Sequence, residues 1–172
     1  MKTILTSLFF IAFSSISFAQ QPTNREIKMI EEINYVREHP QEYIQYIQSY
    51  LDFWDSESSE ISAAKELTKE LKKMKPVQAV EFSDELYKGA IQHGDWMKRR
   101  SKFQHSDLPY AENLVSGDEQ IRFAVLSLLI DDGIPSRGHR KNLLNPSYTK
   151  VACFEVLGKV GENSFVFIQL FE

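Results

Sequence analysis

The order of the secondary-structure signals constrains the fold of this chain most. Five segments have apolar residues at helical spacing, at residues 24–39, 41–53, 61–73, 84–100 and 118–131. The two runs richest in β-branched and aromatic residues come late, at residues 148–157 and 165–171. The polar sequence GKVGEN between them is typical of a hairpin turn. Helices followed by late strands predict an α+β layer fold with an antiparallel sheet.

Three other segments are less regular. AENLV, residues 111–115, predicts a short strand, and residues 134–146 predict irregular chain or one short helical turn. Residues 61–73 are strongly charged, and their sparse apolar line consists of Ala64, Leu67 and Leu71. We expect this stretch to form a short, well-solvated helix, within a helical insertion near residues 52–75.

Length and charge narrow the function classes. A chain of 172 residues with 42% hydrophobic residues is long enough for one ordinary core and too short for two comfortable domains. We therefore expect one domain over residues 20–172, after a signal peptide at residues 1–19. The net charge of -4 gives no reason to expect nucleic acid or an anionic membrane as partner.

The N-terminus has the pattern of an export signal. Lys2 supplies the positive start, and residues 4–18 form an apolar run too short for a comfortable membrane span. Ser17 and Ala19 are small residues at positions -3 and -1 of a cleavage after Ala19. The alternative is a buried N-terminal helix. The signal predicts a secreted or periplasmic protein with no transmembrane segment once the signal is removed.

Cys153 is the only cysteine, so an internal disulfide is impossible. Small exported domains often depend on disulfides, whereas this one must be held by its core, with or without a metal. Cys153 lies in the apolar, strand-like sequence VACFEV. We therefore expect a buried thiol rather than a reactive one.

Two of the four histidines are candidates for chemistry. His105 and His139 lie in polar, turn-rich segments, QHSDLPYAEN and PSRGHRKN, and function is concentrated in such loops. His39 precedes a proline at a helix end and predicts a surface residue, and His93 lies inside a helix and predicts a packed one. The chain contains no HExxH or CxxC zinc signature and no G-x-S-x-G elbow of a serine hydrolase.

Two motifs resemble the CAP superfamily, the SCP-like extracellular domain of cysteine-rich secretory proteins, antigen 5 and plant pathogenesis-related proteins. FQHSDLPYAENL is similar to its F-x-H-S and G-E-N-L segment, and GHRKNLLNPSYTKVACFEV resembles the G-H-R-x-N-I-L-N-P form of bacterial members. EEINYVREHPQEYI and FSDELYKGAIQHGDWM also resemble helices of this family. The resemblance covers nearly all of the predicted mature chain except about residues 52–75.

This resemblance implies an α-β-α sandwich with a three-stranded antiparallel sheet between helices. It also implies a cleft with two histidines and two acidic residues, which in some members holds zinc or another divalent metal. Matched motif by motif, these residues are His105, Glu112, Asp131 and His139.

The match departs from the family pattern at several positions. Asp131 occupies the place of a glutamate, because the helix that normally reads A-V-x-x-W-Y-x-E reads AVLSLLID here. Leu128 and Leu129 replace the aromatic pair of that helix, and Ala111 and Ala152 replace two glycines.

The chemistry of the four cleft residues allows two interpretations. Imidazole nitrogens and carboxylate oxygens are zinc ligands, so His105 and His139 could hold a metal with Glu112 and Asp131 as partners. Without metal, the same residues could form a structural hydrogen-bond cluster.

Three functions follow from the metal-binding interpretation and the family resemblance. The first is a binding or interaction protein for an unknown ligand, such as a lipid or peptide. The second is a metal-dependent hydrolase with Glu112 or Asp131 as general base. The third is a lipid or sterol carrier.

Overall fold

The computed structural model describes residues 20–117 and 120–172. The signal peptide expected at residues 1–19, and the helix start expected at Asp118, lie outside the described residues. Within these two ranges, no helix is both long enough and apolar enough to cross a membrane.

A mixed sheet forms the centre of the molecule. Its order is β1-β3-β4-β2, with β1 at Glu81–Phe82, β3 at Lys150–Val156, β4 at Val166–Phe171 and β2 at Ala111–Val115. The predicted hairpin is formed by β3 and β4, and the predicted short strand β2 pairs antiparallel with β4. The described residues thus form four strands rather than the expected three, because the two-residue β1 adds a parallel edge beside β3.

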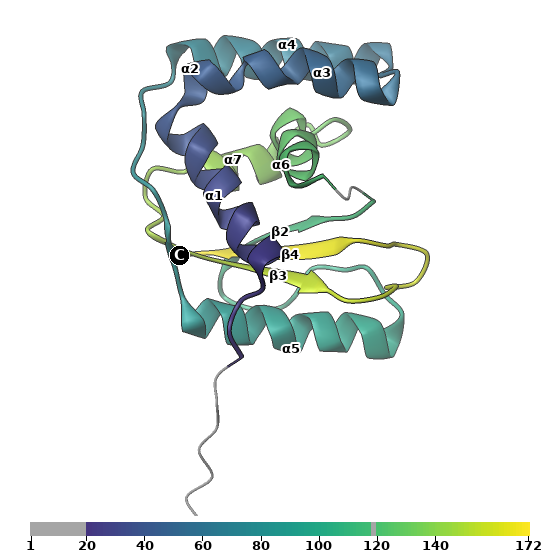
Figure 1. Ribbon diagram of the computed structural model, residues 1–172. Helices are drawn as coiled ribbons and strands as arrows, with labels where there is room; N and C mark the ends of the chain where they lie inside the picture. Colours follow the sequence, from purple (N-terminus) through teal and green to yellow (C-terminus); the bar gives the residue numbers. More distant parts are fainter. Residues whose placement is uncertain (1–19, 118–119) are drawn as a thin grey trace, which may run out of the picture.

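Helices cover both faces of this sheet, which confirms the α-β-α sandwich (Figure 1). α5 packs on one face, while α1, α6 and α7 lie on the other, with α3 and α4 as a further layer outside them (Figure 1). The helices have these bounds: α1 Asn24–Glu38, α2 Pro40–Tyr43, α3 Gln45–Trp54, α4 Ser58–Lys73, α5 Asp84–Arg100, α6 Ile121–Ile130 and α7 Gly138–Leu144.

Local capping explains where α1 begins and ends. The Thr23 side chain accepts a hydrogen bond from the backbone N–H of Glu26, and the Glu26 carboxylate accepts one from the Thr23 N–H, which forms a capping box. The helix ends at Glu38 because Pro40 follows His39 and disfavours helical backbone there.

Two segments are more regular than their sequences indicate. Residues 138–144 form the helix α7, so the expectation of irregular chain or a single turn was wrong. α4 runs for 16 residues, and its Ala63, Ala64, Leu67 and Leu71 are buried in the core that α4 shares with α6, so it is neither short nor fully solvated. That residues 52–75 are an insertion in the family fold stays a prediction.

Cys153 is fully buried in β3, and burial raises the pKa of its thiol well above the usual range. We expect a reducing agent to leave the melting temperature unchanged, because Cys153 has no partner cysteine in the sequence. A thiol reagent should label the native protein only as fast as it unfolds. Rapid labelling without denaturant, followed by mass spectrometry, would contradict this burial.

Candidate functional site

One half of the candidate site is formed where β2 begins. The Glu112 side chain is 6% exposed, and its Oε2 accepts hydrogen bonds from the Ser106 backbone N–H at 2.8 Å and from His105 Nδ1 at 2.8 Å. This geometry suits the tautomer of His105 in which Nδ1 carries the proton and donates to the carboxylate. The Nε2 atom of His105 is then left with a free lone pair.

The other half lies between α6 and α7. Asp131 follows the last residue of α6 in a left-handed conformation, with φ of 54°, which turns its carboxylate toward the start of α7. Its Oδ1 accepts from His139 Nδ1 at 2.7 Å and its Oδ2 from the His139 backbone N–H at 3.0 Å. The shorter aspartate thus reaches His139, and the Nε2 of this histidine is also left free.

The two halves meet at the imidazole rings. The ring centroids of His105 and His139 are 6.2 Å apart, and the ring planes differ by 23°. The structure therefore places all four sequence-predicted residues in one cluster, as two parallel histidine–carboxylate pairs. Their roles in binding or catalysis stay predictions.

A bridge of amide side chains joins the two halves of the site. Asn142 of α7 donates through Nδ2 to Asn113 Oδ1 of β2 at 2.9 Å. Asn113 in turn donates to the His139 carbonyl at 3.3 Å and to the Gln169 side chain of β4 at 3.1 Å. This network fixes the distance between β2 and α7, and with it the spacing of the two histidines.

Arginine side chains hold the Asp131 turn from outside. Arg137 donates through Nη1 to the Asp131 carbonyl at 2.6 Å, and Arg140 donates through Nε to the Leu129 carbonyl at 2.6 Å. Both arginines also bind Glu66 of α4. The hydrogen bond from Arg137 lowers the pKa of the Glu66 carboxyl. Glu66 therefore stays ionised as the pH falls toward its usual pKa, and its ion pairs with the two arginines persist.

His93 belongs to the same cluster, although its sequence context predicts only a packed residue. Its side chain is 6% exposed, and its Nε2 donates to the Gln104 carbonyl at 2.9 Å. The same nitrogen lies 3.6 Å from Glu112 Oε1. The available sequence signal is its position on the inner face of the helix that directly precedes the His105 loop.

The donor set determines which metal site these residues could form. Both carboxylates are occupied by Nδ1–H groups, and in residues 20–117 and 120–172 no three His, Cys, Asp or Glu are grouped to hold a metal ion by themselves. The imidazole donors left free are the two Nε2 atoms, each on a ring oriented by a carboxylate as is usual for zinc-binding histidines, and Glu112 Oε1 also has no hydrogen-bond partner among the described residues. The residues therefore fit an open two-histidine site and not a closed structural one.

Comparison with protein families agrees with this arrangement. The model of the cysteine-rich secretory protein family, CAP, matches residues 30–171. The chain belongs to the CAP family. The matched range includes every residue of the histidine cluster. The α-β-α sandwich of the chain is the fold expected of a CAP domain. A search of individual curated protein sequences returns no match.

Proposed function

We propose that this CAP-domain chain is an exported binding or interaction protein whose His105 and His139 bind a divalent metal such as zinc. One observation supports the proposal above all. Each Nδ1–H is bound to a nearly buried carboxylate, which leaves the Nε2 lone pairs of two neighbouring, nearly parallel rings free. A cluster with only a structural role would not need two unused lone pairs on neighbouring rings.

In this proposal His105 and His139 hold the metal, and Glu112 and Asp131 orient the two rings and increase their basicity. A divalent metal in such an open site would supply a Lewis acid with positions left for water or a ligand group. The protein's own contribution is the fixed ring geometry, which the hydrogen bonds of Asn113 and Asn142 support.

Zinc titration by calorimetry tests the proposal. We expect His105→Ala and His139→Ala each to lose most of the affinity, because each variant removes one of two ligands. Asp131→Asn should weaken binding by about 10–100-fold, since asparagine tolerates the left-handed backbone but orients the ring less well. Affinity should also fall as the pH is lowered, because protons compete for the same nitrogen atoms.

His39→Ala is the matched control, because His39 is an exposed histidine at the junction of α1 and α2. Its loss should leave zinc affinity unchanged. Zinc affinity that survives both cleft substitutions would rule out this site and leave the four residues as a structural cluster.

Export is proposed from the N-terminal sequence pattern alone. We expect the protein recovered from the periplasm or the medium to begin at Gln20, because Ser17 and Ala19 are suited to signal cleavage. Intact-mass spectrometry measures this directly. Recovery of a product that retains Met1 would sink the signal-peptide hypothesis.

A further inference from the structure

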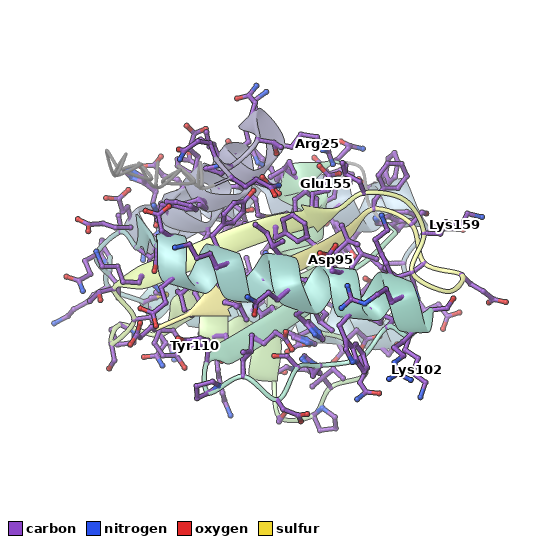
Figure 2. The ribbon with its side chains drawn as sticks, turned by 90° about the horizontal axis from the view of Figure 1, so that it is seen from below. Arg25, Asp95, Lys102, Tyr110, Glu155 and Lys159 are labelled. Atoms are coloured by element: carbon purple, nitrogen blue, oxygen red, sulfur yellow. The ribbon has the colours of Figure 1, made fainter. Side chains whose placement is uncertain are left out.

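A second feature adjoins the histidine cluster on its α5 side. A pocket of about 290 Å³ lies between α5 and the segment of residues 104–108. In Figure 2 this segment runs alongside α5, between the labelled residues Lys102 and Tyr110. The pocket shares His93, His105 and Ser106 with the histidine cluster, and its other lining residues are Gly89, Gln92, Trp96, Gln104, Asp107 and Leu108. The volume is close to the lower end of the range for small-molecule sites.

Hydrogen bonds to the nearly buried side chains of His93 and Glu112 hold the wall of the pocket in place. His93 donates to the Gln104 carbonyl at 2.9 Å, which ties the segment to α5. Behind the wall, Glu112 binds His105 and the Ser106 N–H through Oε2. Its Oε1 lies 3.6 Å from His93 Nε2 and is buried without a hydrogen-bond partner among the described residues. The pocket is thus preformed, so little ordering would be needed on binding.

The absence of a side chain at Gly89 lets the segment approach α5 closely. A Cβ atom built at Gly89 would lie 3.3 Å from Leu108 Cδ1, which is tighter than most such contacts. A side chain at position 89 would therefore displace the Leu108 side chain and fill part of the pocket. This close approach is consistent with a defined cavity rather than an accidental surface hollow.

The lining determines the class of ligand. No lysine or arginine of the described residues lines the pocket, so it lacks the charge to hold an anionic ligand. The rings of His93 and Trp96 are nearly parallel, with centroids 5.8 Å apart and planes at 20°, and provide flat aromatic surface. Gln92, Gln104 and Asp107 are all exposed and add amide and carboxylate groups to the lining.

We propose that this pocket binds a neutral saccharide, with one sugar ring against Trp96. The C–H face of a sugar ring is apolar and packs on an aromatic surface. Its hydroxyl groups both donate and accept, which suits the amides of Gln92 and Gln104 and the carboxylate of Asp107. The proposal goes beyond metal binding, and it needs no metal at His105 and His139.

Heteronuclear NMR titration of the full domain tests the proposal with two probes, cellotriose and triacetylchitotriose. The chain has two tryptophans, Trp54 and Trp96, so Trp54→Phe identifies the indole N–H signal of Trp96. We expect this signal to move saturably with at least one trisaccharide while the Trp54 signal stays in place. The titration is repeated with EDTA and with His139→Ala, and binding should persist in both.

Substitutions at the exposed rim locate the site without disturbing the core. Gln92→Ala and Asp107→Asn should each weaken binding by about three- to tenfold, the usual effect of losing one hydrogen bond. Gln48→Ala, an exposed glutamine on α3, is the matched control and should have no effect. The proposal is overturned by no response to either trisaccharide, by unchanged affinity in both rim variants, or by a Trp96 response to decanoate alone.

Discussion

Replacing Arg140 with Met is expected to lower the free energy of unfolding by about 3–5 kcal/mol, because its buried carbonyl partners lose their donor at about 1–3 kcal/mol each. The Arg140 side chain is almost fully buried, and its guanidinium donates to the carbonyls of Leu129 and Ile130 at the end of α6. It also binds the carboxylates of Glu66 and Glu70 on α4. Methionine fills similar volume but leaves the buried carbonyls without a donor, and these carry most of the loss.

Urea denaturation of Arg140→Met measures this loss. Lys141→Met is the matched control, because Lys141 is the exposed neighbour on the same helix, and it should change stability by less than about 0.5 kcal/mol. A loss below about 1 kcal/mol for Arg140→Met would show that water or neighbouring groups replace the guanidinium easily.

The second large effect is expected at Arg37, which is fully buried near the end of α1. Its guanidinium donates to four backbone carbonyls, those of Gln78, Leu143, Asn145 and Tyr148. Burial lowers its pKa from the usual value, because desolvation disfavours the charged form. Arg37→Met should cost about 4 kcal/mol, since each carbonyl left without a donor costs about 1 kcal/mol or more.

Urea denaturation checks this estimate against Arg99→Met, which removes an exposed arginine of α5. We expect the control to unfold at nearly the wild-type midpoint and Arg37→Met at a much lower urea concentration. Equal midpoints for the two variants would mean that the four carbonyls find other donors when Arg37 is lost.

The long-range contacts of Arg140 also explain why part of the fold could not be predicted from the sequence. The α1 boundaries follow from a local capping box and a proline, and the late strands follow from residue composition, so both were predictable. The α7 segment is polar and rich in turn residues, and its helix depends on Arg140 bonds to α4 and α6. The bonds to α4 join residues 70 or more positions apart and therefore leave no local sequence pattern.

The candidate site also contains residues that the sequence could predict and one that it could not. The family resemblance named His105, Glu112, Asp131 and His139, whereas residue type and sequence context alone singled out only the two histidines. The place of His93 could not be predicted, since its contact with Glu112 requires the chain to fold back along α5.

The left-handed turn at Asp131 also lies beyond sequence reasoning. The position follows a glycine-free helix end, and a glycine would be the usual signal for such backbone. The bonds from Arg137 and from the start of α7 favour this conformation only in the folded protein.

The position of β4 has a consequence for the order of folding. β4 is the last element along the described chain, yet it lies between β3 and β2 and pairs with both. Each histidine–carboxylate pair can form from a short loop, but β2 joins the sheet only through residues 166–171. The two pairs can therefore adopt their final spacing only after this strand has been synthesised and inserted, which makes assembly of the cleft a late event dominated by long-range contacts.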